Sequence, residues 1–150
     1  MRDIWEEQLN WLESGEPFVL ARVIRTWRSA PRKSGAGMLI GKGMDKDPLP
    51  KVLGSVSGGC IEGAVIEEAL DALECGESRR LSFGVEDDLA LSVGLSCGGE
   101  VSVLLEKHWA FSADPNTQKV WDTLQNCIRN NIPAVLISPL PAENGSSGEN

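Results

Sequence analysis

The chain has 150 residues, of which 41% are hydrophobic and 24% charged, and its formal charge at pH 7 is −8. This length and composition are typical of one globular domain that buries a core without disulfides or metals. The longest mainly apolar stretch, residues 132–140, contains two prolines and falls short of the ~20 residues that span a bilayer. The acidic N-terminus lacks the apolar core of a secretion signal, and the negative charge disfavours non-specific binding to nucleic acids.

The predicted elements alternate between helices and strands along the chain. Apolar residues at helical spacing predict helices over residues 3–14, 61–74 and 115–130, and an acidic first turn indicates a shorter helix at 86–94. Runs of β-branched and aromatic residues predict strands at 18–27, 38–41, 52–57, 79–85, 99–107 and 132–138. This pattern predicts a single α/β domain, a mixed β-sheet with packed helices, over residues 1–140. A disordered polar tail is expected at 141–150.

A weak internal repeat relates two parts of the chain. A shift of 116 residues superimposes Trp5 on Trp121, Pro17 on Pro133 and Val19-Leu20 on Val135-Leu136. Both copies are then predicted to be a helix, a cap, a proline and an apolar strand, either as a shared structural unit or by chance.

Charge is distributed unevenly along the sequence. Residues 22–51 hold eight cations and two acids, whereas residues 52–106 hold eleven acids and two cations. Such blocks of charge commonly form solvated faces of a protein. The more specific interpretation is a local site that binds an anion. Four of the cations lie in Arg25–Lys33 together with a tryptophan. Arg25 and Arg32 are candidate contacts for phosphate or carboxylate oxygens, and Trp27 could stack on a flat ring.

Two segments place a cysteine beside a glycine pair. In the first, Ser57, Gly58 and Gly59 permit a tight turn ahead of Cys60, where N–H groups at the helix start favour an anion or a thiolate. A strand–helix turn around a small buried cysteine explains this segment equally well. In the second, Cys97 precedes Gly98 and Gly99 as a strand begins. Two such loops in one domain favour a functional interpretation.

Cys75 and Cys127 lie in helical sequence and are interpreted as structural. With no CxxC pair and no secretion signal, we expect the four cysteines to be reduced thiols in the cytoplasm.

Taken in order, the segments 25–40, 54–70, 83–85 and 93–106 resemble the XdhC/CoxI family over roughly residues 5–107. Members of this family are accessory proteins of xanthine dehydrogenase and related molybdenum hydroxylases. The resemblance implies a chaperone that holds molybdenum cofactor (molybdopterin) as cargo, assists its sulfuration with a cysteine desulfurase and delivers it to the apo-enzyme.

On this resemblance, Cys60 and Cys97 match the cysteine motifs of the family and become candidate molybdenum contacts, which suits soft thiolate ligands. Arg25, Ser29, Pro31 and Arg32 match its arginine-tryptophan loop. Trp27 and an arginine would then serve the flat pterin and the phosphate, or the Gly58-Gly59 backbone would serve the phosphate instead.

Many family members carry a second, Rossmann-like domain that this sequence does not show. A split-gene form, a truncation and a separate subunit that supplies that domain in trans are the open interpretations. The residues also form less than a complete cage for a large cofactor, which favours a homodimer. Two other functions stay open. One is a thiol-dependent redox or sulfur-transfer enzyme in which Cys60 is the nucleophile and Cys97 resolves it. The other is a module that binds the molybdoenzyme and carries no cofactor.

Overall fold

The computed structural model describes residues 4–28, 30–43, 47–84 and 99–141. Its elements in chain order are α1 (Trp5–Glu13), β1 (Phe18–Trp27), β2 (Gly37–Gly41), β3 (Lys51–Gly54), α2 (Glu62–Cys75), β4 (Arg79–Phe83), β5 (Glu100–Lys107), the 3-10 turn η3 (Trp109–Phe111) and α3 (Pro115–Arg129). Three predicted helices and the first five predicted strands are confirmed, with ends that move by a few residues. The helix predicted at 86–94 lies outside the described residues, as does the predicted tail apart from Pro141.

One five-stranded sheet organises the domain, in the order β3-β2-β1-β5-β4. The predicted α/β class, one sheet with packed helices, is confirmed, but all four strand pairings are antiparallel rather than mixed. Hairpin connections of nine residues each join β1 to β2 and β2 to β3, and each pair of neighbouring strands alternates in direction. Helix α2 then carries the chain from one edge of the sheet to the other. Strands β3 and β4 therefore run the same way without being neighbours.

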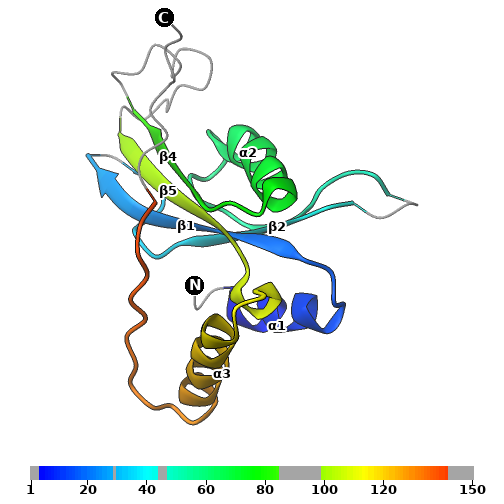
Figure 1. The fold of residues 1–150 in the computed structure, drawn as a ribbon. Coiled ribbons are helices and arrows are strands. Elements are labelled where there is room, and N and C mark those ends of the chain that lie inside the picture. The colour runs from blue at the N-terminus through cyan, green and yellow to red at the C-terminus, as the bar shows by residue number, and fades with distance from the viewer. Residues whose placement is uncertain (1–3, 29, 44–46, 85–98, 142–150) are drawn as a thin grey trace, which may run out of the picture.

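Successive side chains of each strand point to opposite faces of the sheet, so they pack into two separate cores, one on each face. On one face, Val19, Ala21 and Val23 of β1 pack with Val65 and Ala69 of α2. On the other face, β1 and β2 contribute three residues to a cluster with α1, made of Ile4, Trp11, Phe18, Leu20 and Leu39. Figure 1 shows α2 on one side of the sheet and α1 with α3 on the other.

Aromatic side chains hold α3 beside α1. The His108 ring lies between Phe18 and Trp121, with centroid distances of 4.9 and 4.5 Å, and the Trp5 and Trp121 rings are 5.5 Å apart. His108 is 1% exposed, and burial lowers its pKa to about 4 because an imidazolium would lose its hydration there. His108 is therefore a neutral packing residue at physiological pH.

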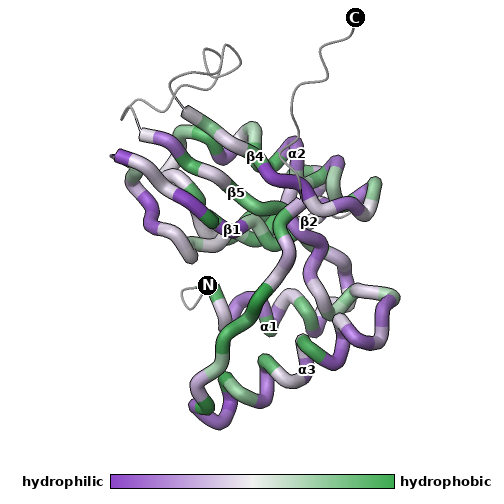
Figure 2. The backbone as a smooth tube through the Cα atoms, turned by 60° about the vertical axis from the view of Figure 1, so that its left-hand side comes forward, coloured by the Kyte–Doolittle hydropathy of each residue, from purple (hydrophilic) through white to green (hydrophobic). Residues whose placement is uncertain are grey.

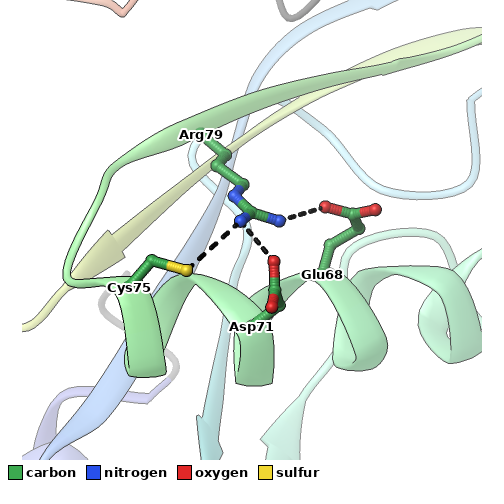
Figure 3. A network of polar contacts seen from close by, with 4 residues as sticks. All are labelled: Glu68, Asp71, Cys75 and Arg79. Atoms are coloured by element: carbon green, nitrogen blue, oxygen red, sulfur yellow. Dashed lines mark hydrogen bonds and ion pairs between the residues drawn. The ribbon is translucent and has the colours of Figure 1, made fainter.

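A charged cluster fastens α2 to the edge strand β4. The Arg79 guanidinium donates to Asp71, lies 2.8 Å from the Glu68 carboxylate and reaches the sulfur of Cys75 at 3.9 Å (Figure 3). The Arg79 side chain is 16% exposed, whereas its two acidic partners are about half exposed. Hydrogen bonds from Arg79 to Glu68 and Asp71 raise the pKa of the guanidinium above its ordinary value. The cluster fixes the end of α2 that lies far from Cys60.

The strand predicted at 132–138 does not form, so this prediction is wrong. The segment is extended but pairs with no described strand, and Val135 and Ile137 are each 88% exposed. Its hydropathy is strand-like, as the green stretch after α3 in Figure 2 shows, but a strand also needs a neighbour for its backbone hydrogen bonds. The second copy of the repeat therefore reproduces the helix and its cap without the strand. Among the described helices, none is long and apolar enough to cross a membrane.

Candidate functional site

The three sequence segments with functional features all attach to the same end of the sheet, which we call the cysteine end. Strands β1, β3 and β4 finish there, while β2 and β5 begin there, because Trp27 pairs with Glu100, Met38 with Gly54 and Phe83 with Val101. The connections 28–36 and 55–61 leave the sheet from this end, and Gly84 and Gly99, the described residues on either side of the second cysteine segment, lie next to it. Antiparallel topology thus brings together segments that are up to about 70 residues apart in sequence.

The loop before α2 is wrapped around the carboxylate of Glu62. The backbone N–H groups of Ser57, Gly58 and Gly59 donate to this carboxylate at 2.9–3.0 Å, and the N–H of Val56 donates at 3.2 Å. The hydroxyls of Ser55 and Ser57 donate to it as well. Positive φ angles at Gly58 (87°) and Gly59 (122°) let successive N–H groups converge in this way. The loop is therefore an anion nest that an internal anion already fills.

This arrangement fixes the position of Cys60 through two hydrogen bonds in series. The Cys60 N–H donates to the Ser57 hydroxyl oxygen at 3.0 Å, and the same hydroxyl donates to Glu62. Burial raises the pKa of Glu62, but the hydrogen bonds from Ser55 and Ser57 outweigh it and hold the pKa at about 2. Glu62 is thus ionised under all ordinary conditions. Cys60 itself is half-buried and packs against the α2-side core.

The β1–β2 loop lies against this cysteine loop. A Cβ atom added to Gly58 would sit 3.6 Å from the Cβ of Pro31, and Ala30 packs on the same core as Cys60. Arg32 is half-buried in this loop. Arg28 adopts a left-handed backbone with φ of 58°, which is strained for a side chain of this size. Such strain is held by its surroundings and is commonly found near functional sites. The structure therefore places the loop that contains Pro31 and Arg32 against the loop that contains Gly58 and Cys60.

Two other predicted contacts lie on the opposite face of the sheet. A β-bulge between Val23 and Arg25 shifts the register of β1, so that Arg25 faces Ser102 and Trp27 faces Glu100. Cross-strand partners share a face, and Val101 and Val103 of β5 point to the α2 side. Arg25 and Trp27 therefore lie on the face away from α2 and Cys60, and the Trp27 side chain is 56% exposed.

The second cysteine–diglycine loop is only partly described. Gly99 is buried next to the first residue of β5, whereas Cys97 and Gly98 lie outside the described residues, as does Ser29. Within the ranges that the structure describes, no group of three or more His, Cys, Asp or Glu side chains is arranged to hold a metal ion. Cys60 is the described residue of the cysteine end that offers sulfur to a soft metal.

Two residues of this site are not evident from the sequence pattern. Glu62 fits the polar face of the helix, although an acid in the first turn after a glycine pair is also a signal for a nest. Arg28 is one cation among several, and nothing in the sequence indicates its left-handed backbone, because arginine rarely adopts it.

Comparisons with known proteins agree on one relationship. Residues 11–84 match the XdhC and CoxI family. The chain is 32% identical to the molybdenum cofactor insertion chaperone PaoD of Escherichia coli K12, and 33% identical to a probable xanthine dehydrogenase subunit of Bacillus subtilis 168. Each match covers 64% of this chain and 28% of the relative.

Among solved structures, a xanthine dehydrogenase from Bacillus halodurans superposes with a TM-score of 0.56 at 30% identity. This match covers 80% of the chain and 34% of that protein. The chain therefore spans about a third or less of the length of these relatives.

Proposed function

Because the chain belongs to the XdhC and CoxI family, we propose that it is an accessory protein of a xanthine dehydrogenase-type molybdenum hydroxylase. In this role it holds molybdenum cofactor as cargo at the cysteine end of the sheet. The observation that carries the proposal is the convergence there of the loop containing Arg32 with the loop containing Cys60. The name of PaoD, a molybdenum cofactor insertion chaperone, supports the same cargo.

The described residues fit a cargo better than a resident metal. A half-buried thiol beside a backbone loop with two glycines gives a bulky ligand close access from one side. Cys60 would contact molybdenum, and the loop of Cys97, Gly98 and Gly99 would supply a second contact.

The phosphate of the cargo needs positive charge from side chains. The N–H groups of Gly58 and Gly59 are engaged by Glu62, so the phosphate would have to displace a carboxylate to use them. We therefore assign the phosphate to Arg32, whose guanidinium can form two parallel hydrogen bonds to its oxygens. Arg25 and Trp27 would contact the part of the cargo that extends past the end of β1 to the other face.

The proposal extends to sulfuration and delivery of the cargo. A cargo that is bound along one side keeps its other side exposed. A cysteine desulfurase and then the apo-enzyme can reach that exposed side while the cargo stays bound to the chaperone. A second copy of this chain, or a subunit with a Rossmann-like domain, would cover the remaining side. In a reducing cytoplasm the Cys60 thiol would stay available for this contact.

The test is an anaerobic titration with molybdenum cofactor, comparing the wild type with Cys60→Ala, Cys97→Ala and Arg32→Gln. Cys75→Ala is the matched control, since Cys75 is an exposed free thiol at the far end of α2. We expect stoichiometric binding that weakens at least tenfold in the first three variants and is unchanged in the control. Equal binding by the wild type and Cys60→Ala would refute the assignment of the cargo to the cysteine end.

A further inference from the structure

The opposite end of the sheet carries a second cationic site. Here β1 begins, β2 and β5 end, and β3 begins, since Phe18 pairs with Gly41, Gly41 with Lys51, and Val19 with Lys107. We call this the lysine end. The antiparallel hairpins thus divide the basic block of residues 22–51 between the two ends of the sheet. The cations near residue 30 reach the cysteine end, and Lys42 and Lys51 reach the lysine end.

A pocket of about 570 Å³ opens at the lysine end. Its volume lies in the range of pockets that hold small metabolites. Trp11 and Phe18 lie at its base but are almost fully buried, and Lys42, Lys51 and Lys107 come to it from three separate segments. Glu16 is the one carboxylate among its lining residues. The residues that line the pocket thus include three cations and one anion, although the whole protein has a net charge of −8.

The three lysines differ in how far their charge is neutralised. Lys42 lies 3.0 Å from Glu74, but both side chains are about 60% exposed, so this pair is weak. The Lys51 ammonium sits 4.4 Å from the centre of the Trp11 ring, a contact that leaves its charge unneutralised. Among the described residues, no carboxylate lies within ion-pair distance of Lys107. Within the part of the chain that the structure describes, the positive charge of this pocket is therefore only partly compensated.

The spacing of the lysines indicates the kind of anion. Lys51 on β3 and Lys107 on β5 are separated by β2 and β1, so their backbones are about 14 Å apart at the usual strand spacing. Lys51 shares the α1 face with Phe18, and Lys107 shares the α2 face with Val19, so the two side chains reach the pocket at the end of the sheet from opposite faces. Two cations that approach from two sides suit two linked acid groups better than a single one. Lysine binds phosphate as a point charge and does not need the geometry of a guanidinium.

From this arrangement we propose that the lysine end binds a small molecule that carries a diphosphate. Lys51 and Lys107 hold its two phosphate groups. This site is independent of the proposed cargo site, because the two lie at opposite ends of the sheet.

Isothermal titration of the full chain with inorganic pyrophosphate tests the proposal at low ionic strength, where exposed charges are least screened. We expect one saturable site, with Lys51→Met and Lys107→Met each weakening the affinity at least tenfold. Methionine keeps most of the apolar stem, and circular dichroism verifies that the variants fold. Lys119→Met, on an exposed turn of α3, is the matched control and should bind like the wild type.

Three outcomes overturn the proposal. One is the absence of saturable binding, and another is an equal loss of affinity in Lys119→Met, which would indicate non-specific attraction. The third is loss of pyrophosphate binding in Arg32→Gln with no loss in Lys107→Met, which would place the anion at the cysteine end. Conversely, failure of molybdenum cofactor to bind leaves the pyrophosphate result unaffected.

Discussion

Replacing Glu62 by Gln probes the nest that positions Cys60. Glutamine keeps the size of the side chain and one acceptor oxygen, but it removes the charge. It also turns an NH₂ group toward the N–H of either Gly58 or Gly59, which now donate to different oxygens of the carboxylate. We expect a less stable domain and a loosened loop, because charge-assisted hydrogen bonds are roughly twice as strong as neutral ones.

The magnitude follows from the pKa of Glu62, which is lowered from 4.5 to about 2. A shift of that size corresponds to about 3 kcal/mol, and partial exposure of the carboxylate reduces the expected cost to about 1–2 kcal/mol. Since the folded state holds the lower pKa, this stability is fully present above pH 4.5. It is lost as the pH falls from 4.5 towards 2, where the carboxyl is protonated in both states.

Urea unfolding of wild type and Glu62→Gln at several pH values measures the effect. The wild type should be more stable by about 1–2 kcal/mol at pH 7, and the difference should shrink steadily below pH 4.5. Amide hydrogen exchange at Gly58 and Gly59 should accelerate in the variant. Equal stability at pH 7, or a difference that persists undiminished at pH 3, would refute the nest as the source of the low pKa.

Three further predictions concern the scaffold. For His108, whose pKa falls from 6.5 to about 4 on burial, stability should drop by up to about 3 kcal/mol as the pH falls through that window. His108→Gln should flatten this pH dependence in urea unfolding. Gly54→Ala should cost about 3 kcal/mol or more, because φ is 84° and the new Cβ would press on the Gly37 carbonyl oxygen. Gly59→Ala, with open space around it, should cost less in the same assay. Arg79→Met should cost about 1 kcal/mol in low salt and less in 1 M NaCl, since its acidic partners are half exposed.

Local sequence patterns predicted most of the elements because their causes are local. The ends of β1 and the body of α2 follow directly from apolar spacing. The end of α2 follows from Gly76, whose φ of 74° stops the helix. The strand predicted at 52–57 ends early, at Gly54, because Glu62 draws the following N–H groups out of the sheet and around its carboxylate. The strand predicted at 132–138 fails because pairing depends on a neighbour, which apolar spacing does not reveal.

The candidate site was predictable as a set of motifs but not as a geometry. Convergence of the loops of Arg32 and Cys60 depends on the antiparallel strand order, which residue types alone leave open. The separation of Arg25 and Trp27 from Cys60 depends on a single bulge in β1. A shift of one residue in strand register moves a side chain to the other face of the sheet. Spacing in the sequence therefore grouped Arg25 and Trp27 with Cys60, although the sheet separates them.

The most direct test of the central claim is protection of Cys60 by the cargo. The measurement is the rate of alkylation by iodoacetamide under anaerobic conditions, with and without saturating molybdenum cofactor, resolved by peptide mass spectrometry. Cys75 serves as the internal control within the same molecule, because it is exposed at the far end of α2. The account predicts that the cofactor slows alkylation of Cys60 at least tenfold and leaves Cys75 unchanged. Equal rates at Cys60 with and without cofactor would contradict it.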